Sequence, residues 1–188
     1  MVNMAQNFFI TGFPRSRTAW LSALFSTDFS DCIHEPFVHL VTCEDIFDYL
    51  KGSNFIHKGL SDSSMAYYHD FISKKFPGCP IVVIEREEGE VTRSLVNFLN
   101  IHWNIADAIV KKIKVGLDII KTFPNVLCVP YDHLDKVDTI EKIWKHCCPD
   151  IIFNVQRTVR FQYLTINQNI AKAQGKLKFT ERALTQLN

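Results

Sequence analysis

The sequence predicts an α/β fold, a three-layer sandwich in which helices cover both faces of a mostly parallel five-stranded sheet. Strand-like runs alternate with helix-like stretches along the chain, and such alternation implies long crossover connections between parallel strands. In addition, the runs IVVI (81–84) and VLCV (126–129) are apolar throughout, which is typical of strands that are buried on both faces.

Five segments have the composition of strands, and each is short and bounded by Gly, Pro, Asn or Asp. They are 7–13 (NFFITGF), 31–36 (DCIHEP), 54–59 (NFIHKG), 80–86 (PIVVIER) and 125–131 (NVLCVPY). The helix-like stretches are 15–27, 42–51, 64–76, 88–121 in two pieces, and 134–147. From about residue 151 onward we expect helical and loop segments that pack on the same domain.

The length of 188 residues predicts a single domain that spans the whole chain, 1–188. Hydrophobic residues make up 47% and charged residues 22%, which is typical of a folded, soluble protein. The chain has 21 basic and 20 acidic residues, so its net charge is close to zero. No overall electrostatic field therefore attracts nucleic acid or an anionic membrane, and we expect neither as a partner. The N-terminal residues carry no basic leader and only a short apolar run, so we expect no signal peptide and no spanning helix.

The six cysteines form no C-x-x-C pair, and several lie in apolar runs where a reduced thiol packs as a small hydrophobic group. This usage favours a reducing, cytoplasmic location. His146, Cys147 and Cys148 are adjacent and raise the question of a metal site. No second ligand cluster has the spacing of a zinc site, so we expect no metal and interpret these residues as the end of a helix.

The stretch TGFPRSRTAW (11–20) places two arginines on a turn between the first strand and the first helix. A strand, a tight turn and a helix direct backbone N–H groups and the positive end of the helix dipole to one point, which favours phosphate or sulfate. Arg15 and Arg17 add forked, charged donors, while Ser16 and Thr18 add hydroxyl groups. The stretch therefore predicts an anion-binding loop at the carboxyl edge of the sheet.

A small-molecule kinase would usually carry the pattern G-x-x-x-x-G-K-[ST], in which Lys reaches the terminal phosphates and Ser or Thr holds magnesium. This sequence lacks the Gly-Lys pair, and we find no apolar strand that ends in Asp to complete a magnesium site. ATP hydrolysis is therefore disfavoured, although a P-loop kinase stays as an alternative.

The same stretch resembles the phosphosulfate loop of the sulfotransferases that use 3'-phosphoadenosine 5'-phosphosulfate (PAPS), which typically reads G-x-P-[RK]-S-G-T-T-x-[WL]. The resemblance implies a fold of the P-loop nucleotide-binding type. It also implies that PAPS is bound by Pro14, Arg15, Ser16, Arg17 and Thr18, and that Trp20 stacks on the adenine. Two positions depart from the family pattern, because Arg17 stands where Gly is usual and Ala19 where Thr is common.

A second motif is similar to the family's site for the 3'-phosphate, in which an Arg at the end of a later strand is followed eight residues on by a Ser. Arg86 closes the fourth predicted strand, and Ser94 lies eight positions later. The alternative is that Arg86 pairs with Glu85, Glu87 or Glu88 and that Ser94 is merely exposed.

NVLCVPYDHL (125–134) is similar to a family strand that ends in Y-E-D-L. The resemblance implies that Tyr131 reaches the adenine; a Tyr that closes a strand also serves in packing. For Trp20 the alternative is a core position on the first helix.

The resemblance implies transfer of a sulfuryl group from PAPS to a hydroxyl or amine of a small-molecule or carbohydrate acceptor, with no metal required. We expect Arg15 to stabilise charge on the leaving oxygen. A base must accept the acceptor's proton, and Glu35 in HEPF is the first candidate. His57 in FIHKG is the second, because it loosely resembles the strand end that carries the family's base. Alternatively, Glu35 forms an ion pair with a loop arginine and His57 is a satisfied strand histidine.

A third reading belongs to another class of protein, a nucleotide-binding module that keeps the anion-binding loop without turnover. Arg17 at the usual Gly position is the reason to consider it. The motifs predict neither the acceptor nor an oligomeric state.

Overall fold

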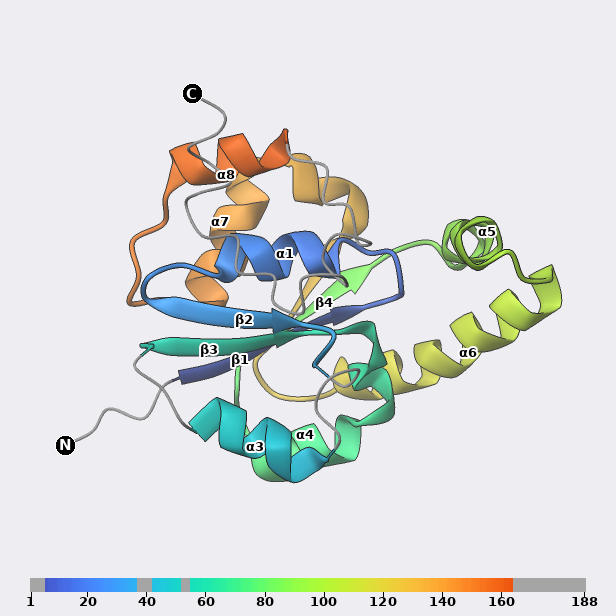
Figure 1. Ribbon diagram of the computed structural model, residues 1–188, viewed down its shortest axis with the longest axis horizontal. Helices are drawn as coiled ribbons and strands as arrows, with labels where there is room; N and C mark the ends of the chain where they lie inside the picture. The colour runs from blue at the N-terminus through green and yellow to red at the C-terminus, as the bar shows by residue number, and fades with distance from the viewer. Residues whose placement is uncertain (1–5, 37–41, 52–54, 164–188) are drawn as a thin grey trace.

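The computed structural model describes residues 6–36, 42–51 and 55–163, in which five strands form one sheet (Figure 1). The strands are β1 (Gln6–Gly12), β2 (Ser30–His34), β3 (His57–Ser61), β4 (Ile81–Glu85) and β5 (Val126–Pro130). Their order across the sheet is β2-β3-β1-β4-β5, and each neighbouring pair is parallel. The predicted α/β architecture with a five-stranded sheet is confirmed.

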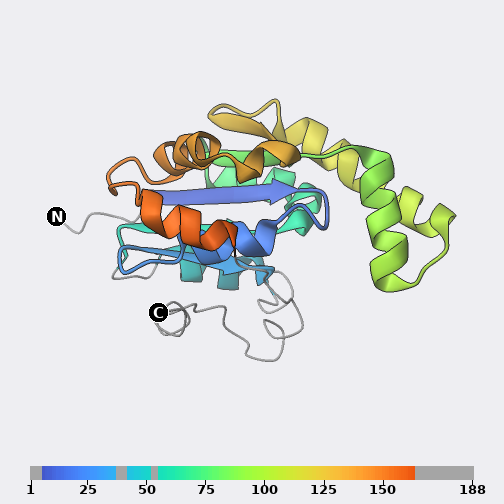
Figure 2. The same ribbon diagram turned by 90° about the horizontal axis from the view of Figure 1, so that it is seen from above.

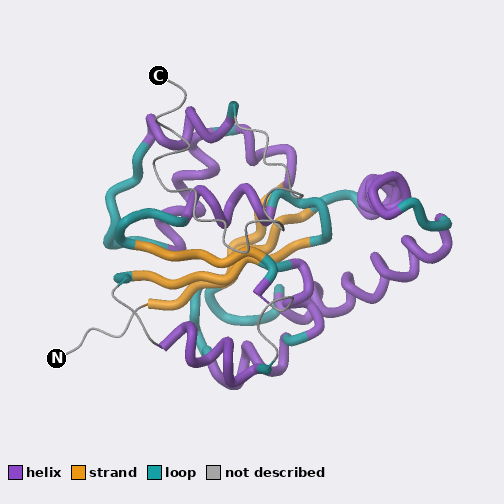
Figure 3. Tube along the Cα trace, in the orientation of Figure 1, coloured by secondary structure: helices purple, strands orange, loops and turns teal. Residues whose placement is uncertain are grey.

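Helices cover both faces of the sheet and complete a three-layer sandwich (Figures 1 and 3). One face carries α1 (Thr18–Phe25), α7 (Val137–Cys147) and α8 (Val155–Gln162). The other face carries α3 (Cys43–Lys51), the 3₁₀ turn η1 (Ser63–Tyr67), α4 (His69–Lys75) and α6 (Trp103–Ile120). α5 (Glu88–Leu99) lies beyond the carboxyl ends of the strands, and with the start of α6 it forms a projecting arm (Figure 2).

Two hydrophobic cores lie on opposite sides of the sheet because successive strand residues point to opposite faces. Phe8 and Ile10 of β1 join Val82 of β4 in the core beneath α1 and α7. Phe9 and Val83, from the same two strands, lie in the core beneath α4 and α6. All five side chains are at most 1% exposed, so the central strands are buried on both faces, as their apolar runs predicted.

The third strand differs from its prediction, because it spans His57–Ser61 rather than 54–59. Gly59, the last residue of the predicted strand, lies in the middle of β3. The ring of Phe8 on the neighbouring strand fills the space beside it, since a Cβ on Gly59 would lie 2.2 Å from that ring. Close packing, and not a turn, therefore requires glycine here. Residues 52–54 lie outside the described part of the chain.

The predicted helix at 15–27 begins only at Thr18, because Arg15 and Arg17 have positive φ angles that an α-helix does not accommodate. The stretch 88–121 is divided as predicted, and Asn100 in the left-handed conformation (φ 52°) ends α5. The helices predicted at 42–51, 64–76 and 134–147 correspond to α3, to η1 with α4, and to α7.

Part of the tail after residue 151 packs on the same domain, as expected. Phe161 of α8 is 1% exposed and lies in the core with α1 and α7. The rest of that prediction, residues 164–188, falls outside the described residues.

Candidate functional site

The candidate site is built on the loop 13–17, which joins β1 to α1 at the carboxyl edge of the sheet (Figure 1). Arg15 and Arg17 have φ angles of 68° and 59°, so the backbone is left-handed at both positions. Left-handed residues within a turn gather backbone N–H groups into a concave surface that binds anions. α1 starts at this loop with no side-chain cap and no acidic residue in its first turn. The loop therefore presents backbone donors and a positive helix end in one place.

The start of the loop is held against the end of β4. Gly12, the last residue of β1, is in register with Ile84. A Cβ on Gly12 would lie 2.7 Å from the carbonyl oxygen of Ile84, which is closer than a side chain can come. The absence of a side chain thus brings the loop beside the residues that follow β4.

Ser16 lies at the centre of this loop and is 0% exposed. Its Oγ has no hydrogen-bond partner among the residues that the structure describes. A buried hydroxyl without a partner costs about 1–3 kcal/mol, so the loop is destabilised unless another group bonds to it. An oxygen of a bound anion would satisfy this hydroxyl.

Arg86 directly follows β4 and contacts the loop. Its Nη1 donates a hydrogen bond of 2.8 Å to the carbonyl oxygen of Arg15. Its Nε lies 3.4 Å from Oε2 of Glu90 in the first turn of α5, so its acidic partner is none of Glu85, Glu87 and Glu88. The two arginines predicted to bind the two ends of one nucleotide thus lie side by side.

Tyr131, at the start of the 3₁₀ turn η2 (Tyr131–Asp135) just after β5, lies close to two guanidinium groups. The guanidinium of Arg86 is 4.2 Å from the centre of the Tyr131 ring, and that of Arg17 is 5.4 Å from it. Arg17 also forms an ion pair with Asp135. The side chain of Arg17 therefore binds η2 at the rim of the site, and its backbone takes the left-handed conformation for which glycine is usual.

Arg15 extends toward the end of α5, where its guanidinium lies 4.3 Å from the centre of the Phe98 ring. Phe98 is 44% exposed, so part of this aromatic residue is accessible to solvent beside Arg15. Pro14, the preceding loop residue, is half-buried. Ser94 is half-buried on α5, eight residues after Arg86.

Glu35 follows β2 at the same edge of the sheet and is held by its neighbours. Its N–H donates a 3.0 Å hydrogen bond to Ser61 at the end of β3, and its φ is 49°. Its Oε1 lies 3.9 Å from Nε2 of His34, and that nitrogen lies 3.2 Å from Oγ1 of Thr18, the first residue of α1. Through His34, Glu35 thus lies close to the start of α1, directly after the loop 13–17.

The structure does not bring His57 into this site. His57 is the first residue of β3, in register with Gln6 at the beginning of β1, so it lies at the amino edge of the sheet. It is 0% exposed and faces Asp150, whose Oδ2 lies 3.9 Å from its Nε2. The prediction that His57 lies at the carboxyl edge is wrong because the third strand begins, rather than ends, at this residue.

The side chain of Trp20 is used in the core. Its Nε1 donates a 2.8 Å hydrogen bond to the carbonyl oxygen of Phe161, and the two rings meet edge to face. With 7% of Trp20 exposed, neither face of the indole is available to an adenine, which corrects the stacking prediction. The helical position that resembles the family pattern points here toward α8.

Sequence reasoning missed two residues that shape the site, Phe98 and Asp135. Phe98 is one apolar residue on an amphipathic helix, and Asp135 is 118 positions away from its partner Arg17. The only signal in the sequence was that each follows a predicted site residue by four positions on the same element, Phe98 after Ser94 and Asp135 after Tyr131.

Among residues 6–36, 42–51 and 55–163, no three His, Cys, Asp or Glu side chains come together as metal ligands would. His146 lies 3.2 Å from the carbonyl oxygen of Ile81, and the thiols of Cys147 and Cys148 are buried in the core. This part of the chain also holds no helix with the length and apolar character needed to span a membrane.

Comparison of the sequence with models of protein families and with curated proteins found no match. Among solved structures, the chain is similar to mouse sulfotransferase SULT7A1 in complex with PAP, with a TM-score of 0.61 at 14% sequence identity. The similarity covers 84% of this chain and 62% of the mouse chain, so this chain spans less than two thirds of that protein. The fold is therefore that of a sulfotransferase.

Proposed function

We propose that this protein transfers a sulfuryl group from PAPS to a hydroxyl or amine of a small-molecule or carbohydrate acceptor. The observation that carries the proposal is the hydrogen bond from Arg86 to the carbonyl oxygen of Arg15. It joins the end of β4 to the loop after β1, so the two elements that we propose to bind the anionic groups lie next to each other. The likeness in fold to a sulfotransferase that was solved with PAP supports the same reading.

The residues at the site fit a nucleotide that carries two anionic groups. The loop N–H groups and the hydroxyls of Ser16 and Thr18 would hold the sulfate-bearing end, and the Oγ of Ser16 is buried without a partner in the described structure. Arg86 and Ser94 would hold the ribose 3'-phosphate. Tyr131, whose ring already packs on the guanidinium of Arg86, would contact the adenine.

PAPS supplies the sulfuryl group, and the chain supplies positioning and charge. Arg15 holds a positive charge beside the loop, where negative charge develops on the leaving oxygen. Glu35 accepts the proton of the acceptor hydroxyl or amine and is kept in place by its backbone bond to Ser61. This proposal assigns no step to His57, which lies at the other edge of the sheet, and no step to a metal.

Calorimetric titration with 3'-phosphoadenosine 5'-phosphate (PAP), and separately with ATP and magnesium, tests this proposal. We expect PAP to bind more tightly. Tighter binding of ATP with magnesium would favour a P-loop small-molecule kinase instead. Turnover of PAPS with a panel of hydroxyl and amine acceptors then distinguishes an enzyme from a nucleotide-binding module, which would bind PAP without turnover.

A further inference from the structure

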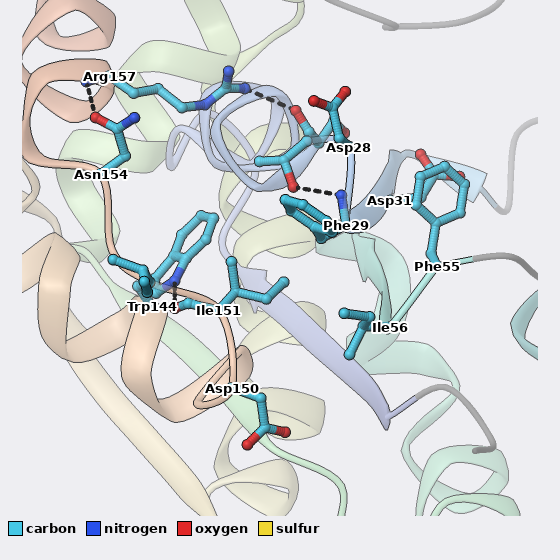
Figure 4. A pocket seen from close by; sticks show the side chains of 13 residues that line it. Asp28, Phe29, Asp31, Phe55, Ile56, Trp144, Asp150, Ile151, Asn154 and Arg157 are labelled. Atoms are coloured by element: carbon cyan, nitrogen blue, oxygen red, sulfur yellow. Dashed lines mark hydrogen bonds between the residues drawn. The ribbon is translucent and has the colours of Figure 1, made fainter.

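A pocket, which we call the amino-edge pocket, lies at the edge of the sheet opposite to the candidate site (Figure 4). It is bounded by residues 26–29 after α1, by residues 55–56 before β3 and by the segment from Trp144 to Arg157. Its volume is about 730 Å³. Cavities of several hundred cubic ångströms are the size that holds small organic ligands.

The walls of the amino-edge pocket include several large apolar side chains. Phe29 is 56% exposed and Ile56 is 49% exposed, and the N–H of Ile56 donates a 2.9 Å hydrogen bond to the carbonyl oxygen of Phe29. Trp144 on the other side donates through Nε1 to the carbonyl oxygen of Ile151 at 2.8 Å. Figure 4 shows these four side chains around the hollow. Apolar surface exposed in a concave site favours a ligand with an apolar body.

Three carboxylates line the same pocket, those of Asp28, Asp31 and Asp150, and we call them the acidic rim. Asp31 accepts a 2.9 Å hydrogen bond from Tyr49 and interacts with the nearby Lys58. In the described part of the chain, neither Asp28 nor Asp150 has a Lys or Arg within ion-pair distance. At least two negative charges of the rim are therefore not compensated by a cation.

Arg157 is the basic residue of the pocket lining, and its guanidinium group contacts backbone carbonyl oxygens at the end of α1. Its Nη2 donates to the carbonyl oxygens of Ser26 at 2.7 Å and Ala23 at 3.2 Å, and its Nε donates to that of Leu24 at 3.4 Å. The guanidinium thus compensates the negative end of α1. The acidic rim retains its own charge.

His57 lies behind Asp150 as a buried polar group. It is 0% exposed, neither ring nitrogen has a hydrogen bond in the described structure, and Nε2 faces the Asp150 carboxylate at 3.9 Å. Burial lowers the pKa of His57, so the imidazole is neutral at neutral pH and leaves the charge of Asp150 in place. His57 is not part of the pocket lining, so it acts on the pocket only through its neighbour Asp150.

We propose that the amino-edge pocket binds an organic amine, with its apolar body against Phe29, Ile56 and Ile151 and its ammonium group at the acidic rim. Apolar walls provide most of the affinity, and the carboxylates select for positive charge. Because the pocket and the anion-binding loop lie at opposite edges of the sheet, this ligand is separate from the nucleotide, and the inference does not depend on the proposed function.

Titration of the backbone amide signals in NMR tests this proposal with three matched probes: 3-phenylpropylamine, the neutral alcohol 3-phenylpropanol and the anion 3-phenylpropanoate. We expect the amine to shift the amides of Phe29, Ile56 and Ile151 saturably and to bind about fivefold more tightly than the alcohol, since one partly exposed ion pair contributes about 1 kcal/mol. The propanoate should bind more weakly than either.

Variants test which residues cause the preference for the amine over the alcohol. Asp28→Asn and Asp150→Asn should each reduce the preference for the amine over the alcohol, and Phe29→Ala should weaken both probes. Asp118→Asn on α6, far from the pocket, is the matched control and should change neither. PAP affinity is measured in parallel and should be unchanged in all four variants, which separates this test from that of the proposed function. Equal binding of amine and alcohol, shifts outside the pocket, or no binding at millimolar amine would overturn the proposal.

Discussion

Arg86 is the residue that connects the two halves of the candidate site, so its removal is the most direct test of the site. Arg86→Ala removes the forked donor that we propose for the ribose phosphate, and also the bond to the carbonyl oxygen of Arg15. We expect PAP affinity to fall about 10- to 100-fold, since a hydrogen bond to a charged group contributes about 1.5–3 kcal/mol. Calorimetric titration measures the change.

The exposed Arg93, one turn further along α5 than Glu90, offers a matched control, because Arg93→Ala removes the same charge away from the loop. The affinity of the Arg93→Ala variant for PAP should stay near that of the wild type. Arg15→Ala should weaken binding as Arg86→Ala does. Unchanged affinity in both variants would rule out the site as described.

Glu35 should matter for transfer and not for nucleotide binding. Glu35→Gln keeps the size of the side chain and its backbone bond to Ser61 but can no longer accept a proton. We expect PAP affinity within about twofold of the wild type and a loss of turnover of at least about 100-fold, which is the usual contribution of a general base. Transfer from PAPS to an accepted acceptor is the measurement. A fully active variant would show that another group takes the proton.

Arg17 tests whether a side chain at a usual glycine position binds the nucleotide. Its left-handed backbone costs about 1 kcal/mol, which Arg17→Gly would relieve, and its partly exposed ion pair with Asp135 contributes about 0.2–1 kcal/mol, which the variant would lose. We expect the free energy of unfolding to change little and PAP affinity to be retained. A large loss of affinity would instead make Arg17 a direct donor to the nucleotide.

At the scale of elements, sequence patterns predicted the strands and helices well because their signals are local. The apolar run Phe8–Ile10 in β1 and the polar residues that follow β4 are each recognised from neighbouring residues in the chain. Gly59 shows where this fails, since it is required by the Phe8 ring on another strand. The same holds for the site: Arg86 follows a clear strand, whereas the direction of Trp20 is set by α8 and could not be read from the loop motif.

The contact between α6 and η1, which are distant in the sequence, gives a testable prediction at the scale of elements. Gly116 lies in the middle of α6, where Ala has a higher helix propensity by about 1 kcal/mol. However, a Cβ there would lie 1.9 Å from the carbonyl oxygen of Ala66 in η1, so the two elements would have to separate. We expect Gly116→Ala to destabilise the protein by about 1–3 kcal/mol in urea unfolding.

Val115→Ala is the control for this variant, because Val115 is the preceding residue on the same helix and is 63% exposed. Its effect should stay within about 0.5 kcal/mol. If Gly116→Ala were stabilising, as helix propensity alone predicts, α6 and η1 would not be packed as closely as described.

At the scale of the whole molecule, one buried imidazole couples overall stability to pH. Burial lowers the pKa of His57 below its ordinary value of 6.5, although Asp150 and the backbone of Gln6 partly oppose this effect. The unfolded chain therefore binds a proton at a higher pH than the folded protein does. Consequently the free energy of unfolding has its full value above pH 6.5. It decreases as the pH falls through 6.5 toward the pKa of His57 in the folded protein.

His57→Phe should remove this dependence, because a buried ring of similar size has no proton to bind. We expect the loss of stability of the wild type between about pH 7.5 and pH 5, measured by urea unfolding, to be smaller in the variant. His102→Asn, which keeps an acceptor for the N–H of Asn104 at the start of α6, changes an exposed histidine and should leave the wild-type dependence intact. Equal pH dependence in wild type and His57→Phe would mean that other groups cause it. In Asp150→Asn the loss should be larger, since the carboxylate that favours the imidazolium is gone.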